Sequence, residues 1–196
     1  MAELPHRPSS FQVDLTRGHP TWDAATKRRR AIWELVVKPL FRMLPRRANG
    51  ARISLLRLMG AKIGHTCLVE AGVNVLMPWH LELGDYAAIG RGTEILNFAL
   101  VSIGAMTVVS QRSHLCAGSH DYTHPHFPLT SAPIRIGAEC WIATEAFIGP
   151  GVTVGNGAVV GARSVVTKDL PAWTVCAGNP CKPIKPRVMK KISPDR

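Results

Sequence analysis

The stretch "IGAECWIATEAFIGPGVTVGNGAVVGARSVVT", Ile136–Thr167, carries an aliphatic side chain at every sixth residue. These residues are Ile136, Ile142, Ile148, Val154, Val160 and Val166. The same step occurs upstream at Ile63, Val69 and Val75, at Leu83, Ile89 and Ile95, and at Ile103, Val109 and Leu115. A period of six does not match a helix, and it fits a short strand and a corner, repeated. Three such faces close a triangular coil of about 18 residues, and stacked coils bury a continuous aliphatic column.

Glycine and small residues support this interpretation. Of the twelve residues that follow an aliphatic position at a regular corner, eight are glycine: 64, 84, 90, 104, 137, 149, 155 and 161. Glycine permits a positive φ or a close backbone approach, either of which a corner can need. Small side chains stand four residues after the aliphatic one, at Cys140, Ala146, Ala158 and Ser164. We therefore expect a mainly β solenoid with a crowded interior.

Three segments resemble one enzyme family, the hexapeptide-repeat acyltransferases. They are "RLMGAKIG", "SQRSHLCAGSHDYTHPHFPLTSAPIRIG" and "PGVTVGNGAVVGARSVVTKDLPAWTVCAGNPCKPIK", and the resemblance extends over about residues 60–187. It is strongest to polysaccharide O-acetyltransferases of the colanic-acid-biosynthesis type. It implies a left-handed parallel β-helix, acetyl-CoA as co-substrate and a homotrimer with sites between subunits. The expected organisation is a helical cap over 1–62, a β-helix over 63–178 with an extended loop at 116–135, and a basic tail over 179–196.

Charge is distributed unevenly along the chain. The formal charge is +9 over residues 1–62, −3 over 63–166 and +5 over 167–196. A mildly acidic body argues against a continuous nucleic-acid groove, and the basic ends predict local anionic partners such as a membrane surface or a phosphorylated cofactor.

The chain has no apolar run long enough to span a bilayer and its first residues lack the apolar core of a signal peptide, so we expect a cytoplasmic protein. Its five cysteines form no CxxC pair and are expected to be reduced thiols.

The long break between Leu115 and Ile136 interrupts the repeats and contains several histidines. A break of this length inside a compact domain is usually functional. His120, in "GSHDY", matches the family's catalytic histidine, and an imidazole suits the task of taking a proton from a hydroxyl near neutral pH. His124 and His126 are expected to be exposed loop residues. Asp121 directly follows the expected base and could serve as a turn residue.

Three further residues are candidates for binding the acceptor. Asn97, one coil before the loop, and Trp141, in "ECWIA", resemble residues near the acyl site of related enzymes. His114 lies in the last six-residue unit before the loop. For Trp141 the alternative is an outward apolar residue that packs against a neighbouring subunit.

Acetyl-CoA is expected along the later coils. The resemblance implies contacts with Ala143, Gly161, Ala162, Thr167, Lys168, Lys182 and Lys185. Lysines near the C-terminus would meet the cofactor phosphates as charge-assisted donors. The sequence contains no P-loop or dinucleotide fingerprint, and no metal is expected.

The first 60 residues lack the six-residue repeat. Helical spacing is found at Trp33, Val36, Val37, Leu40, Phe41 and Leu44. A kink is expected in this helix at Pro39, and a second helix is expected over Arg52–Met59. Such helices would cover the open end of the coil stack, as solenoids require. A basic amphipathic face would also suit contact with an anionic membrane that carries a lipid-linked saccharide.

The sequence thus predicts an O-acetyltransferase that moves acetyl from acetyl-CoA to a sugar hydroxyl in exopolysaccharide biosynthesis. Alternatives are a small non-polysaccharide hydroxyl acceptor, a metal-dependent enzyme like the gamma carbonic anhydrases, and a non-catalytic β-helix scaffold.

Overall fold

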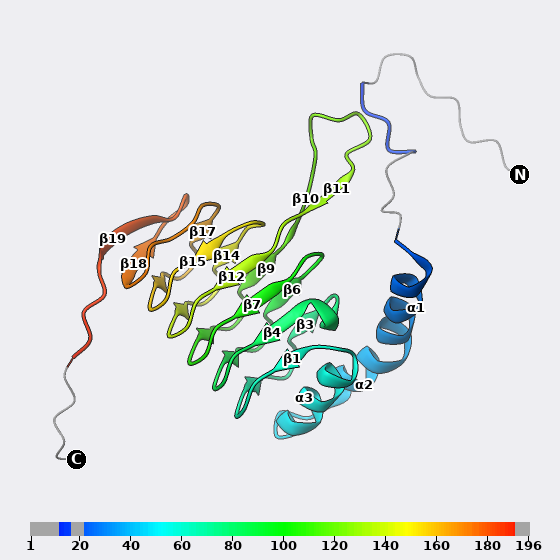
Figure 1. Cartoon of the computed structure of the whole chain (residues 1–196), viewed down its shortest axis with the longest axis horizontal. Helices are drawn as coiled ribbons and strands as arrows, with labels where there is room; N and C mark the ends of the chain where they lie inside the picture. The colour runs from blue at the N-terminus through cyan, green and yellow to red at the C-terminus, as the bar shows by residue number, and fades with distance from the viewer. Residues whose placement is uncertain (1–11, 17–21, 191–196) are drawn as a thin grey trace, which may run out of the picture.

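The computed structural model describes residues 12–16 and 22–190, and it shows the expected left-handed parallel β-helix (Figure 1). Sheet A contains β1 (Lys62–Ile63), β4 (Leu81–Leu83), β7 (Val101–Ile103), β12 (Ile134–Ile136) and β15 (Thr153–Val154). Sheet B contains β2 (Leu68–Val69), β5 (Ala88–Ile89), β8 (Val108–Val109), β13 (Trp141–Ile142), β16 (Val159–Val160), β18 (Thr174–Ala177) and β19 (Lys182–Pro186). Sheet C contains β3 (Asn74–Val75), β6 (Glu94–Leu96), β9 (His114–Cys116), β14 (Phe147–Ile148) and β17 (Val165–Val166). Each strand pairs in parallel with the strand one coil away, except that β19 runs antiparallel to β18.

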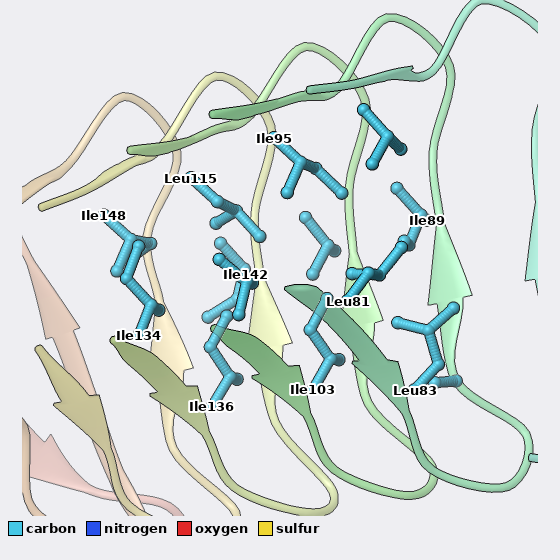
Figure 2. Close-up of a cluster of buried hydrophobic side chains, with 14 of the residues drawn as sticks. Leu81, Leu83, Ile89, Ile95, Ile103, Leu115, Ile134, Ile136, Ile142 and Ile148 are labelled. Carbon is cyan, nitrogen blue, oxygen red and sulfur yellow. The ribbon is translucent and has the colours of Figure 1, made fainter. Parts of the chain in front are cut away.

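The aliphatic positions predicted from the period of six form the interior of the prism (Figure 2). Ile89 pairs with Val109, and Ile142 pairs with Val160, so equivalent positions lie one above the other. All fifteen positions are buried except Ile63, which lies in the first coil and is half-buried. The small residues Cys140, Ala146, Ala158 and Ser164 are buried as well. The hydrophobic column therefore runs through the described coils without a break.

The repeated glycines serve close backbone approach rather than a positive φ. A Cβ on Gly84 would lie 2.5 Å from the amide nitrogen of Ala105 in the next coil. The left-handed conformation falls instead on corner residues such as Tyr86, at φ 60°. Of the two reasons that the sequence left open for these glycines, contact between coils is the one that applies.

Four helical segments cover the first coil: α1 (Ala24–Ile32), the π-helix η1 (Trp33–Val37), α2 (Lys38–Met43) and α3 (Asn49–Leu58). A fifth, the short 3-10 helix η2 (Pro78–His80), lies between β3 and β4. Trp33, Val37 and Phe41 join the core, and the indole Nε1 of Trp33 donates to the Val75 carbonyl at 3.0 Å. The buried Arg52 donates from Nε to the Val69 carbonyl at 2.7 Å. The helices thus supply donors to the open edge of the first coil.

Three local features refine the expectations from the sequence. At Pro39, where a kink was expected, the helix changes to a π-helical turn just before the proline, which accommodates the missing amide, and the Lys38 N–H donates to the Trp33 carbonyl. The second helix starts at Asn49 rather than Arg52, and the Asn49 side chain bonds to Cys67 and Val69 of the first coil. The C-terminal segment after residue 178 is not all tail, since β19 extends sheet B.

Candidate active site

An antiparallel hairpin leaves the β-helix after β9. It consists of β10 (Gly118–His120) and β11 (Leu129–Ser131), with His120 opposite Leu129. The Ala132 amide donates to the Ala117 carbonyl at 3.0 Å and closes its base. Figure 1 shows the hairpin projecting well beyond the prism. The break in the repeat is therefore an ordered excursion that carries His120 away from the coils.

The ring of His120 is oriented by a backbone carbonyl. Its Nδ1 lies 2.6 Å from the carbonyl oxygen of Phe127. Because a carbonyl only accepts, Nδ1 must carry the proton, and Nε2 of the neutral ring is left with its lone pair. The imidazole is exposed, so Nε2 is accessible to a substrate. Sequence reasoning predicted His120 as the base but did not anticipate Phe127, which contributes a main-chain atom that no side-chain pattern reveals.

The tip of the hairpin is held by short-range bonds. Thr123 donates from its amide and its hydroxyl to Asp121, and these bonds lower the pKa of that carboxyl. Asp121 thus acts as a turn residue. The Asp14 amide donates to the Pro125 carbonyl, and Nδ1 of His126 lies 2.8 Å from the Asp14 carbonyl, so residues 12–16 rest on this tip.

The three candidate acceptor residues lie in different environments. Asn97 is at the base of the hairpin but fully buried, and its amide group exchanges two hydrogen bonds with the backbone of Met77. It can therefore fix the chain beneath the hairpin, while its side-chain atoms are occupied. His114 faces outward from sheet C between Glu94 and Phe147, and its Nε2 is buried without a hydrogen-bond partner. That Nε2 is unpaired but has no exposed surface in this structure.

Trp141 lies on the outer face of sheet B and is half exposed. Its Nε1 donates to Oγ of Ser110 at 3.0 Å. Leu68 and Val108, on the same sheet face, are also exposed apolar residues. Trp141 therefore lies where it could pack against a neighbouring subunit, which is the alternative to an acyl-site role that the sequence suggested.

Most of the expected acetyl-CoA residues share one edge of the prism, which we call corner BC. It comprises residues 70–73, 90–93, 110–113, 143–146 and 161–164, each between a strand of sheet B and the next strand of sheet C. Ala143, Gly161 and Ala162 belong to it, and Lys182 extends it because it pairs with Ala177. Within the described residues, the amide N–H groups of Thr144 and Ala162 donate to no protein group. Unpaired main-chain donors in a row suit a polar, extended ligand.

Thr167 and Lys168 lie on a different edge, which we call corner CA. It comprises residues 76–80, 97–100, 117–133, 149–152 and 167–169, each after a strand of sheet C. The hairpin with His120 leaves from this same corner. Sheet C, about 13 Å wide at 3.3 Å per residue, separates corner CA from corner BC. A single chain thus keeps His120 apart from Ala143 and Ala162.

The five cysteines are free thiols. Burial raises the pKa of Cys140 and Cys176, while Cys116 is half-buried beside the hairpin, with Sγ 3.2 Å from the Gly118 carbonyl.

Over residues 12–16 and 22–190, no three His, Cys, Asp or Glu side chains converge as a metal site would require. In the same ranges, none of the helices combines the length and the hydrophobicity needed to cross a membrane.

Comparisons with known proteins agree with this geometry. Residues 133–168 match the family model for bacterial transferase hexapeptide (six repeats). The chain is 46% identical over 157 residues to the putative colanic acid biosynthesis acetyltransferase WcaF of Escherichia coli, covering 80% of this chain and 86% of that protein. Among solved structures, a maltose O-acetyltransferase from Clostridium difficile superposes with a TM-score of 0.78 at 26% identity, over 85% of this chain and 90% of that one.

A galactoside acetyltransferase solved in complex with coenzyme A superposes with a TM-score of 0.76 at 28% identity, over 86% of each chain. The period of six, the extended hairpin with its histidine and the similarity to WcaF over most of both lengths lead to one conclusion. The chain belongs to the hexapeptide-repeat acetyltransferases.

Proposed function

We propose that the chain transfers acetyl from acetyl-CoA to a saccharide hydroxyl in the biosynthesis of an exopolysaccharide of the colanic-acid type. The observation that supports this best is the hydrogen bond from His120 Nδ1 to the Phe127 carbonyl, because it presents Nε2 as a base. The similarity to WcaF and to a galactoside acetyltransferase supports a saccharide acceptor.

In the proposed reaction, His120 Nε2 takes the proton from the acceptor hydroxyl as its oxygen attacks the thioester carbonyl carbon. A carbon–oxygen bond forms, and the carbonyl becomes an oxyanion. When the tetrahedral intermediate collapses, the carbon–sulfur bond breaks and the imidazolium returns its proton to the leaving thiolate. The Phe127 carbonyl holds the ring through both proton transfers. The reaction is direct, with no acyl-enzyme.

Corner BC offers a surface that fits acetyl-CoA. The unpaired amides of Thr144 and Ala162 would bond to the pantetheine arm. The exposed Lys182 at the end of that corner, and the exposed Lys185 farther along β19, would meet the phosphates. Thr167 and Lys168 would approach the same ligand from corner CA of another subunit.

We further propose a trimer, in which corner CA of one subunit faces corner BC of its neighbour. This arrangement would bring His120 to a thioester that its own chain cannot reach. The exposed apolar residues of sheet B, including Leu68, Val108 and Trp141, are the kind of surface that such packing covers. His114 would then line the acceptor pocket, and Asn97 would position the base of the hairpin.

The helical cap suggests where the enzyme works. Its outer face, which we call the outer stripe, comprises Ile32, Leu35, Val36, Leu40 and Met43, all exposed. Arg42, Arg46 and Arg47 are exposed beside it. An apolar stripe flanked by cations fits the anionic surface of a cytoplasmic leaflet, where a lipid-linked acceptor would be found.

The test is acetyl transfer from acetyl-CoA to a panel of saccharides by wild type and His120→Ala. We expect kcat to fall by about 10²- to 10⁴-fold, the usual contribution of a general base, with acetyl-CoA binding retained. His65→Ala is the matched control, because His65 is an exposed corner residue whose side chain makes no hydrogen bond among the described residues. Retained activity in His120→Ala, or loss of activity in Cys116→Ala alone, would reverse the assignment.

A further inference from the structure

A pocket of about 410 Å³ opens on corner BC of the early coils. It is lined by Arg46, Glu70, Arg91, Gly92, Gln111 and Arg112. Arg46 comes from the segment between α2 and α3, and the other residues come from three consecutive coils. None of these residues was among the sites predicted from the sequence.

Positive charge is concentrated at this pocket, although the β-helical part of the chain is acidic overall. Residues 63–166 have a net charge of −3 and contain only four basic residues, Arg91, Arg112, Arg135 and Arg163. Three of the four lie on corner BC, and Arg46 of the cap adds a fourth guanidinium. Random placement on a triangular prism would scatter them over all three corners and faces. Arg91 lies two residues after the core residue Ile89, and Arg112 and Arg163 lie three residues after Val109 and Val160, so all three occur at the same kind of corner, a signal that sequence reasoning missed.

The carboxylates nearby do not neutralise this group. Glu145 pairs with Arg112 and Arg163, each at 2.6 Å, and Glu70 lies 3.5 Å from Arg46. The Arg91 guanidinium makes no ion pair or hydrogen bond in the part of the chain that the structure describes. Four guanidiniums against two carboxylates leave an excess of two positive charges, with Arg91 exposed and uncommitted. A planar guanidinium in this state suits a bidentate contact with a carboxylate or phosphate.

The pocket lies in line with the proposed acetyl-CoA surface. The Gln111 carbonyl accepts a hydrogen bond from the Thr144 hydroxyl at 2.9 Å, so the last coil of the pocket adjoins the first coil of that surface. Neighbouring coils are about 4.8 Å apart. A pantetheine arm that runs from Lys182 past Ala162 and Thr144 would end beside Gln111. The pocket then begins where the thioester would lie, on the side away from the cofactor phosphates.

We infer that this arginine pocket binds an anionic group of the saccharide acceptor, a carboxylate of a uronic acid unit or a phosphate on the sugar. Arg91 makes the principal contact, and Arg46 and Arg112 complete the positive surface. The inference rests on the proposed function and narrows its substrate class to acidic saccharides. A neutral sugar would offer these guanidiniums no anionic partner, and they would remain hydrated.

The test compares three acceptors: a neutral methyl hexoside, its uronic acid counterpart and its sugar phosphate. Each is assayed with wild type, Arg91→Gln, Arg91→Lys and the control Arg135→Gln, an exposed arginine on sheet A. We expect wild type to prefer one acidic acceptor. Arg91→Gln should raise KM for it about tenfold, as loss of one charge-assisted contact implies, with KM for the neutral acceptor and for acetyl-CoA unchanged. Arg91→Lys should recover part of the loss, and Arg135→Gln should match wild type.

The outcomes separate this inference from the proposed function. Preference for the uronate or for the sugar phosphate identifies the anion. Equal turnover of acidic and neutral acceptors, insensitive to Arg91→Gln, would overturn the inference and leave the acetyltransferase intact. A rise in KM for acetyl-CoA in Arg91→Gln would also overturn it, because the pocket would then hold the cofactor's phosphates. Acetylation of no saccharide at all would refute the proposed function itself.

Discussion

Gly118, the first residue of the hairpin, lies against the ring of Phe98 in the preceding coil. A Cβ on Gly118 would lie 2.9 Å from Cε2 of Phe98 and closer still to Cδ2. Gly118→Ala should therefore tilt the hairpin and misplace His120. We expect kcat to fall tenfold or more, since a displacement of about 1 Å at a reacting group can cost 10²-fold, while the melting temperature changes little.

The matched control for this prediction is Gly50→Ala in α3, where a Cβ would meet no atom within 4 Å. Phe98→Leu in the Gly118→Ala background should restore part of the activity by making room. Full activity in Gly118→Ala would show that the hairpin does not position the base.

The cap depends on Arg52. Its guanidinium donates to the carbonyls of Val69, Pro45 and Arg46. Arg52→Met should leave these carbonyls without donors and lower the free energy of unfolding by about 2–4 kcal/mol. Arg57→Met, which removes bonds made by an exposed side chain to Ile63 and Gly64, should cost about 1 kcal/mol or less. Denaturant unfolding of both variants provides the measurement, and equal losses would contradict the burial argument.

Glu145 gives a pH dependence with a definite sign. Hydrogen bonds from Arg163 and then Arg112 lower the pKa of this carboxyl from its ordinary 4.5. A lowered folded-state pKa stabilises the fold above the unfolded-state value, and that stabilisation is lost as pH falls through the folded-state pKa. The difference in melting temperature between wild type and Glu145→Gln should therefore be constant above about pH 5.5 and vanish at lower pH. A difference that persists unchanged at about pH 2.5 would contradict this assignment.

The outer stripe should bind vesicles that contain anionic lipid. Leu35 and Met43 are 76% and 80% exposed, and replacing both by serine removes apolar area that would enter the bilayer. We expect flotation with the vesicles to fall at least about tenfold, and binding by wild type to weaken as salt rises. Val188→Ser, at another exposed apolar position, is the control. Failure of wild type to float at low salt would exclude the membrane contact.

The sequence predicted the prism well because one physical constraint repeats. Each of Ile89, Ile142 and Val160 must enter the same narrow column, so burial imposes the same spacing throughout. The π-helical turn before Pro39 was not predictable in this way, because it depends on how one helix packs over the first coil. The cap's apolar residues likewise divide into a buried and an exposed stripe, and the spacing alone could not show which face the core would take.

The candidate site was only partly predictable from the sequence, because it too depends on contacts between distant parts of the chain. The resemblance predicted His120 as the base, but the carbonyl that orients its ring belongs to Phe127, whose side chain takes no part in that hydrogen bond. Asn97 resembles a residue near the acyl site of related enzymes. Its side-chain amide is nevertheless buried and fully occupied by two hydrogen bonds with the backbone of Met77. Arg91 and Arg112 became a group only when the coils placed residues 21 apart in sequence beside each other.

The central claim is that His120 of one subunit serves acetyl-CoA bound on corner BC of another. Mixed oligomers test it directly. His120→Ala lacks the base, and Ala162→Trp blocks corner BC, so neither alone should transfer acetyl. Co-expressed and purified together, the two variants should regain about one quarter of wild-type activity, since random assembly pairs an intact corner with an intact His120 at that frequency. Mixed oligomers with no more activity than either variant alone would contradict a site shared between subunits.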